Sequence, residues 1–172
     1  MTLDDLGELP DFPLPFNYYF TFFEPGLERP WAEIATDAGE FATVEAALDQ
    51  LQLEFGEKKP EFSKRSIFLR SPIDEYIGTA TAWYSDDFMG SRWGRLHWVS
   101  IRPAYQGKKL GKPLVRGALD IMRKFHSKVY LTTQTTSFAA IKIYLQFGFE
   151  PLIRSSKDRE IWENVENVEN SF

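Results

Sequence analysis

The sequence predicts an α/β (α+β) protein in which strand-forming and helix-forming segments alternate along the chain. Runs rich in aromatic and β-branched residues indicate the strands, and segments whose apolar residues recur three and four positions apart indicate the helices. The 172 residues are 43% hydrophobic and 16% aromatic, so the chain can bury a substantial core. We therefore expect a single domain over residues 1–172 with the element order β-α-α-β-β-β-α-β-α-β.

The first third of the chain predicts one strand and two helices. Residues 1–15 are acidic and contain prolines, which favours an irregular lead-in. The aromatic run 17–23 predicts the first strand. Helices should follow over 30–39, which begins with a proline, and over 43–55, which begins with a threonine in the N-cap position and is followed by Gly56. The polar stretch 57–64 is expected to be a loop.

The middle of the chain predicts three strands in succession. Residues 66–70 read as a short strand, and 76–84 as a longer one that alternates small and bulky side chains. Residues 85–92 contain the polar and glycine residues of a hairpin loop. The next strand, 96–101, should place His97, Val99 and Ile101 on one face because strand side chains alternate.

The last third predicts two helices, each followed by a strand, and a tail. Apolar spacing indicates helices over 112–125 and 137–148, with strands over 129–133 and 150–153. The tail 155–172 contains the micro-repeat ENVENVEN and is expected to be a helix or partly disordered.

The segment QGKKLG at 106–111 joins a strand to a helix and carries chemistry. Backbone N–H groups of a glycine-bearing turn and the positive end of a helix dipole can converge on an anion, and lysines add charge. Many such turns bind nothing, however. The residues alone therefore leave two interpretations open: a phosphate cradle or an ordinary strand-to-helix connection.

Two motifs together resemble the GNAT (GCN5-related) N-acetyltransferase superfamily. The pattern (Gln/Arg)-x-x-Gly-x-(Gly/Ala) of its pyrophosphate loop maps onto Gln106, Lys109 and Gly111, where Lys109 replaces the usual glycine. Residues 137–149 resemble its N-x-x-A-x-x-x-Y…GF segment, with Ser137 replacing the usual asparagine. The resemblance implies a mixed central sheet flanked by helices, with a splay between two parallel strands that admits pantetheine.

The resemblance also implies acetyl-CoA as cofactor and a set of residues that bind it. These are expected on the strand beside the thioester, in the pyrophosphate loop and at the starts of the two following helices. They are Val99, Ser100, Ile101, Gln106, Gly107, Lys108, Lys109, Leu110, Gly111, Lys112, Ser137 and Tyr144.

The expected catalytic residues are His97 and Tyr144. His97 is the first candidate for general base because the pKa of histidine lies near neutrality. Alternatively, His97 is a buried structural residue, and water, Glu75 or Glu24 is the base. Tyr144 matches the family's tyrosine that protonates the departing thiolate, although its helical spacing also suits a core aromatic. The second histidine, His126, is expected at the surface.

The predicted function is acetyl-CoA-dependent transfer of an acyl group to a primary amine of a small molecule or peptide. The alternative is a non-catalytic GNAT-fold module that binds CoA or a nucleotide as a sensor. The acceptor pocket is expected from 31–55 and 85–92, where four aromatic residues suggest a partly apolar acceptor: Trp31, Phe41, Phe55 and Phe88.

Charge and composition narrow the partners. Residues 102–128 hold eight Lys or Arg and one acid, which suits a polyanionic cofactor, whereas residues 1–57 hold thirteen acids and one arginine. The net charge of −5 argues against nucleic acid. There is no cysteine, only two histidines and no long apolar run, so we expect no metal site, no membrane association and a cytoplasmic location. A homodimer is left open.

Overall fold

Six strands form one mixed sheet in a computed structural model that describes residues 1–169, with side chains described through residue 165. The strand order is β1-β6-β5-β4-β3-β2, and only the β5–β6 pair is parallel. The strands are β1 (Thr2–Leu3), β2 (Tyr19–Phe22), β3 (Ser66–Arg70), β4 (Tyr76–Phe88), β5 (Ser91–Ile101) and β6 (Val129–Tyr130).

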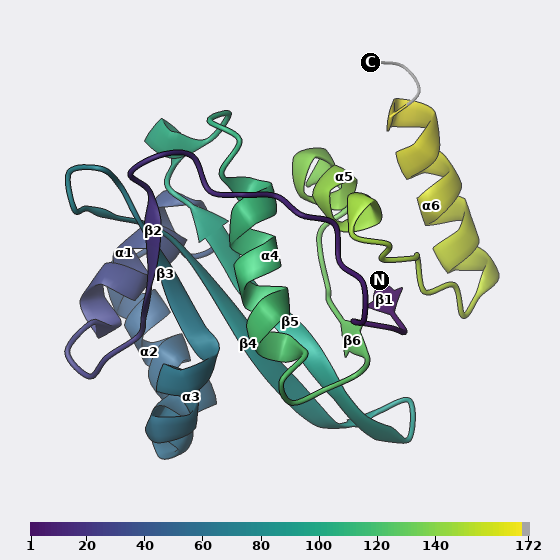
Figure 1. Ribbon diagram of the computed structural model, residues 1–172. Helices are drawn as coiled ribbons and strands as arrows, with labels where there is room; N and C mark the ends of the chain where they lie inside the picture. Colours follow the sequence, from purple (N-terminus) through teal and green to yellow (C-terminus); the bar gives the residue numbers. More distant parts are fainter. Residues whose placement is uncertain (170–172) are drawn as a thin grey trace.

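Helices cover both faces of this sheet (Figure 1). Helices α1, α2 and α3 pack on one face, and α4 and α5 on the other, while α6 lies beyond α5 near the β1 edge. The helical segments are α1 (Glu28–Asp37), α2 (Val44–Phe55), η1 (Gly56–Lys58), α3 (Lys59–Arg65), η2 (Pro103–Tyr105), α4 (Gly111–Met122), α5 (Phe138–Gln146) and α6 (Ser156–Glu169). The expected mixed sheet flanked by helices is confirmed.

The parallel strands β5 and β6 separate after two residue pairs. Gly94 pairs with Val129 and Arg95 with Tyr130, and no further pair joins the two strands. Strand β5 nevertheless continues to Ile101, while the chain after β6 turns away towards α5. One edge of β5 beyond Arg95 therefore faces a gap instead of a partner strand within the described residues, which is the splay that the resemblance implied.

A β-bulge interrupts β5 within this unpaired stretch. His97 pairs with Thr81 and Ser100 with Thr79, so Trp98 and Val99 together oppose a single residue of β4. Trp98 has a φ of 48°, a left-handed conformation that bulges can impose. The extra residue reverses the alternation. Trp98 packs with α1 and α2, whereas Val99 packs with α4, on the opposite face of the sheet.

The expected shared face of His97, Val99 and Ile101 is therefore wrong. His97 contacts Glu54 of α2, whereas Val99 and Ile101 pack into the cluster that contains α4. The strand thus presents a histidine to one side of the sheet and apolar residues to the other. The bulge residue Trp98 is held by aromatic contacts, and its indole N–H also donates to Glu54 at 3.2 Å.

Other element boundaries differ from the sequence prediction for local reasons. The expected loop 57–64 is helical, because buried Phe62 anchors α3 beneath the sheet. The expected 85–92 loop shrinks to Met89 and Gly90, both with positive φ, in a two-residue hairpin turn. The expected strand 150–153 is reduced to one bridge from Glu150 to Thr2.

The first fifteen residues and helix α6 lie beside the α5 half of the sheet (Figure 1). The 1–15 segment contains β1 and runs across α4 and α5 (Figure 1). Arg116 of α4 holds it by donating to the carbonyls of Leu9 (3.2 Å) and Pro10 (2.7 Å). In the expected tail 155–172, helix α6 is described to Glu169, and residues 170–172 lie outside the described residues.

Candidate functional site

Two clefts open on opposite sides of the splay and share part of their lining. The α4 cleft, of about 980 Å³, lies between the end of β5, the loop before α4 and the start of α5. The α2 cleft, of about 710 Å³, lies between the α1–α2 connection, α2, β5 and the segment after β6. Four residues line both clefts: Val99, Ser137, Ala140 and Tyr144.

The loop before α4 presents a run of backbone donors. Gly107 and Lys109 have positive φ values of 75° and 61°, which turn the chain tightly before α4 begins at Gly111. The N–H groups of residues 107–112 have no acceptor within the described chain. Such donors at a helix N-terminus form a site for an anion, where the helix dipole adds to their attraction.

Charged and polar side chains surround these donors. Lys109 and Lys112 line the α4 cleft. Lys108 does not line it; its Nζ lies 4.4 Å from the ring centroid of Tyr105. The amide of Gln106 donates to the carbonyl of Ile101 at 2.9 Å and so fixes the loop to the end of β5. Every expected cofactor contact except Lys108 lines the α4 cleft.

The positive φ of Lys109 gives a stability prediction. Lys109→Gly should raise the free energy of unfolding by about 1 kcal/mol, because glycine has no Cβ to oppose the left-handed conformation. Urea denaturation measures this. Lys108→Gly is the matched control, since the φ of Lys108 is not positive and glycine there gains nothing. Equal losses of stability in both variants would contradict the prediction.

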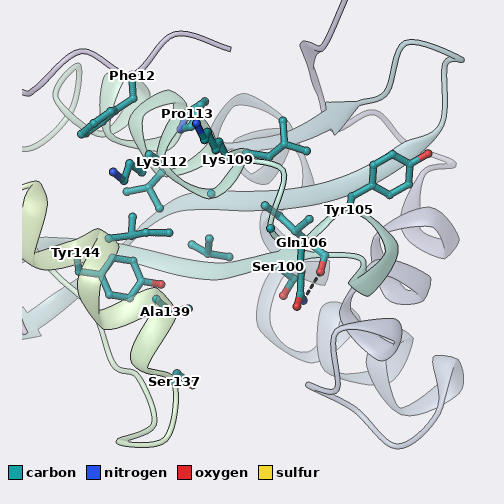
Figure 2. A pocket seen from close by; sticks show the side chains of 18 of the residues that line it. Phe12, Ser100, Tyr105, Gln106, Lys109, Lys112, Pro113, Ser137, Ala139 and Tyr144 are labelled. Atoms are coloured by element: carbon teal, nitrogen blue, oxygen red, sulfur yellow. Dashed lines mark hydrogen bonds between the residues drawn. The ribbon is translucent and has the colours of Figure 1, made fainter. Parts of the chain in front are cut away.

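The walls of the α4 cleft come from β5 and α5 (Figure 2). Figure 2 shows Tyr144 and Ser137 along the α5 side and Ser100 and Gln106 opposite them. The Oγ of Ser100 is buried without a hydrogen-bond partner in the described chain, so a bound group that reaches the splay would satisfy it. Ser137 occupies the N-cap position of α5, but its hydroxyl makes no capping hydrogen bond and remains available to either cleft.

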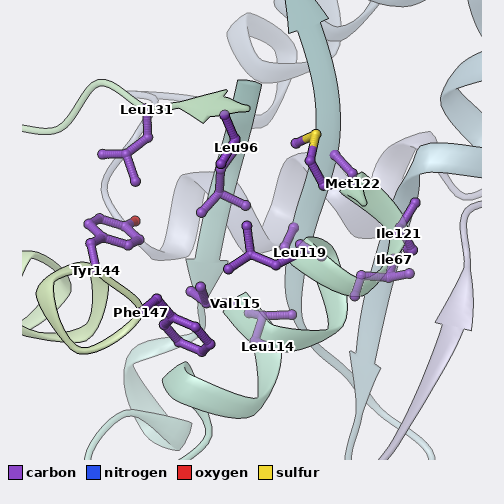
Figure 3. Packing of buried hydrophobic residues seen from close by; sticks show 14 of the residues in the cluster. Ile67, Leu96, Leu114, Val115, Leu119, Ile121, Met122, Leu131, Tyr144 and Phe147 are labelled. Carbon is purple, nitrogen blue, oxygen red and sulfur yellow. The ribbon is translucent and has the colours of Figure 1, made fainter. Parts of the chain in front are cut away.

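Tyr144 joins the core to the two clefts. Its ring is 7% exposed and packs with Val115, Leu96 and Phe147 in the cluster beneath α4 (Figure 3), so the core interpretation holds for the ring. Its hydroxyl has no hydrogen-bond partner among the described residues. Burial, assisted by the charge of Glu40, raises the pKa of Tyr144 to about 12, which keeps the hydroxyl protonated at neutral pH.

His97 is paired with a carboxylate in the α2 cleft. Its Nε2 lies 2.7 Å from Oε2 of Glu54, which also accepts a hydrogen bond from Trp98, while Oε1 of Glu54 accepts one from Gln50. Burial alone would raise the pKa of Glu54, but these hydrogen bonds and the charge of His97 hold it at about 2. Burial lowers the pKa of His97, and the charge of Arg95 acts in the same direction; the hydrogen bond and the charge of Glu54 oppose this shift without reversing it.

This pairing fixes the state of the imidazole. With a lowered pKa, His97 is neutral at pH 7, and the ionised carboxylate of Glu54 requires the hydrogen on Nε2. The lone pair therefore lies on Nδ1, which can accept a proton. Glu54 thus fixes both the tautomer and the orientation of the imidazole.

Sequence reasoning missed Glu54 and chose other carboxylates. Glu54 precedes Phe55 at the end of an apolar helix stripe, and nothing local singles it out. Glu75 accepts a hydrogen bond from Tyr105, and Glu24 is exposed; neither lines the α4 or the α2 cleft. His126, outside both clefts, is partly buried and stacks on a tyrosine, so its expected surface position is only partly correct.

The expected apolar acceptor pocket is mostly wrong. Phe41 lines the α2 cleft, but Trp31 and Phe55 are buried in the core, and Phe88 stacks on Tyr130 away from both clefts. The lining of the α2 cleft is instead rich in charged and polar side chains: Glu40, Gln50, Glu54, Arg95, His97, Thr132, Thr133 and Gln134.

None of the helices in the described part of the chain combines the length and the apolar composition needed to cross a membrane. Over the same residues, no group of three or more His, Asp or Glu side chains is arranged to hold a metal ion.

Known proteins resemble this chain in sequence. The model of the acetyltransferase (GNAT) family matches residues 27–149. N-alpha-acetyltransferase RimI of Mycobacterium tuberculosis is 34% identical over 90 residues, which cover 48% of this chain and 56% of the relative. Mycothiol acetyltransferase of Renibacterium salmoninarum is 27% identical over 169 residues, which cover 87% of this chain and 45% of the relative. The chain thus spans about half the length of these curated relatives.

Solved structures share the fold. PH1933 from Pyrococcus horikoshii OT3 superposes with a TM-score of 0.66 at 16% identity, over 81% of this chain and 92% of that one. Aminoglycoside N-acetyltransferase AAC(6')-Iy in complex with CoA gives a TM-score of 0.62 at 16% identity, over 80% of this chain and 91% of that one. At these identities the similarity establishes the architecture alone.

Proposed function

The chain belongs to the GNAT acetyltransferase family, and on that premise we propose that it transfers an acetyl group from acetyl-CoA to a primary amine of a small molecule or peptide. The observation that carries this proposal is the meeting of the two clefts. The α4 cleft holds anion-binding donors, the α2 cleft holds a carboxylate-paired histidine, and Tyr144 and Val99 line both.

The α4 cleft fits acetyl-CoA. The free N–H groups of residues 107–112, with Lys109 and Lys112, would hold its pyrophosphate. The unpaired edge of β5 at Val99–Ile101 and the hydroxyl of Ser137 would hold the pantetheine arm. When bound, the thioester supplies an activated acyl carbon, and the splay lets that end of the arm reach the α2 cleft.

The α2 cleft suits the removal of a proton from the amine. Glu54 holds the imidazole ring of His97 through the hydrogen bond to Nε2. Nδ1 of His97 then accepts a proton from the acceptor amine as the amine nitrogen bonds to the acyl carbon. The hydroxyl of Tyr144 donates a proton to the thiolate as the C–S bond breaks. Both residues line the α2 cleft, so both can serve one reacting centre.

Ligand binding tests the cofactor assignment. Acetyl-CoA should raise the melting temperature, because a ligand that binds only the native state stabilises it by about 2.7 kcal/mol at a hundred times its Kd. Desulpho-CoA should do the same, since the proposed loop donors would bind the phosphate groups and not the sulfur. Pantetheine, which lacks those phosphates, is the control. Thermal shifts measure all three, and no shift with either CoA ligand would refute the assignment.

Turnover separates the enzyme from a sensor. Lys109 and Ser137 depart from the family motifs, which keeps a non-catalytic CoA-binding module as the second candidate. An enzyme releases free CoA thiol from acetyl-CoA faster when a panel of primary amines is added, whereas a sensor binds acetyl-CoA and releases none.

The cytoplasmic location and the homodimer stay predictions. Cell fractionation tests the location, and light scattering tests the oligomeric state.

A further inference from the structure

Arg95 is an unpaired cation in the wall of the α2 cleft. Every other arginine between residues 29 and 123 forms an ion pair with a carboxylate. Arg95 forms none within the described chain, and its Nε is buried without a hydrogen-bond partner. A buried guanidinium nitrogen without an acceptor is costly, so its retention in a cleft needs an explanation.

The position of Arg95 relates it to the proposed reacting centre. Arg95 and His97 are two residues apart on β5, before the bulge. Their side chains therefore project from the same face, about 7 Å apart along the strand. The charge of Arg95 also acts on the pKa of His97, which places the guanidinium within electrostatic reach of the imidazole. A group bound at Arg95 would therefore lie several bonds from an amine at His97.

A second unpaired charge lies at the other end of the cleft. Glu40 lines the same cleft, has no ion-pair partner among the described residues and acts electrostatically on Tyr144. The cleft thus offers a carboxylate near the Tyr144 end and a guanidinium near the β5–β6 pairing. Opposite charges at the two ends complement a ligand that is cationic at one end and anionic at the other.

We propose that Arg95 binds a carboxylate of the acceptor, and that the acceptor is a primary amine whose amine and carboxylate are separated by several bonds. The planar fork of arginine matches a carboxylate through two parallel hydrogen bonds. A phosphate fits less well, because Glu40 and Glu54 in the same cleft repel a dianion. This inference rests on the proposed acetyl transfer for the place of the amine.

Binding without turnover tests the proposal. The chain, saturated with CoA, is titrated calorimetrically with 4-aminobutyrate, 5-aminopentanoate and 6-aminohexanoate, and with n-alkylamines of the same carbon number. At least one amino acid of the series should bind about 10- to 100-fold more tightly than its alkylamine, as expected for charge-assisted hydrogen bonds. Glycine, in which amine and carboxylate are too close, should bind no better than ethylamine.

Two variants assign the preference to Arg95. Arg95→Gln should abolish the advantage of the amino acids and leave alkylamine binding unchanged, and Arg95→Lys should retain part of it because the charge remains. Arg92→Gln is the matched control. It removes the same charge from the same strand, but Arg92 is paired with Asp86 and lines neither cleft.

The outcomes separate this inference from the proposed function. If alkylamines and amino acids bind alike in the wild-type chain, or if Arg95→Gln keeps the difference, the inference is wrong even when acetyl transfer occurs. If the amino acids bind preferentially through Arg95 but no amine is acetylated, the carboxylate site stands and the proposed function fails. The wild-type ligand pairs give a result even if Arg95→Gln does not fold.

Discussion

Replacement of His97 by alanine should lower kcat/KM for the amine by about 10²–10⁴-fold, the usual contribution of a general base. The apparent affinity for acetyl-CoA should change little, because His97 lines the α2 cleft and not the α4 cleft. Steady-state kinetics with each substrate varied in turn measures both effects. Activity should recover partly at high pH, where the amine loses its proton without help.

The same role of His97 predicts the direction in which kcat/KM changes with pH. Only neutral His97 can accept a proton, so wild-type kcat/KM should rise as the pH increases through the pKa of His97. Burial places that pKa below the ordinary histidine value. In the alanine variant this rising limb should disappear and be replaced by one that follows the pKa of the amine.

A matched histidine variant controls this experiment. His126→Ala removes the other histidine, which lies outside both clefts, and should leave the rate and the pH profile unchanged. If His97→Ala lowers the melting temperature and keeps the wild-type profile, His97 is a structural residue. The base is then water or Glu54, and Glu54→Gln distinguishes these two.

The loop before α4 could be predicted from sequence because its parts are contiguous. A strand, a turn and a helix N-terminus follow one another over residues 96–122, and their geometry depends mainly on local residue types. Lys109 illustrates the limit. The sequence identifies it as a departure from a glycine motif, but only the structure gives its φ of 61° and thus the reason that glycine suits the position.

The α2 cleft was poorly predicted because it depends on residues far apart in the sequence. Glu54 and His97 are separated by 43 positions, and no periodicity in either segment indicates that they meet. The bulge at Trp98 then decides which face His97 occupies. Its left-handed φ is held by rings from other elements, Trp31 and Phe41, so strand alternation alone gave the wrong face.

Aromatic content misled the acceptor prediction for a related reason. A large aromatic residue is as suitable for a core as for a pocket, and sequence alone does not separate the two. Trp31 and Phe55 are buried, and only Phe41 of the four expected residues lines the α2 cleft. Charged residues carry more information here, because Arg95 and Glu40 line the cleft without an ion-pair partner among the described residues, and the Nε of Arg95 is buried without a hydrogen-bond partner.

Tyr144→Phe should lower kcat by about 10²-fold or more, because the thiolate then leaves without a proton donor. The variant should fold normally. Phenylalanine keeps the ring contact with Phe149, whose centroid lies 5.9 Å away, and the lost hydroxyl has no hydrogen-bond partner in the described chain. Thermal unfolding and acetyl-CoA titration should therefore match the wild type, which confines the defect to turnover.

The pH dependence separates Tyr144 from His97. With a pKa of about 12, Tyr144 stays protonated throughout the usable range, so its loss should lower the rate by the same factor at every pH. High pH should give Tyr144→Phe no recovery, in contrast to His97→Ala. Tyr130→Phe, which alters a tyrosine outside both clefts, should behave as wild type. If Tyr144→Phe keeps full activity, or recovers at high pH as His97→Ala does, its hydroxyl is not the proton donor.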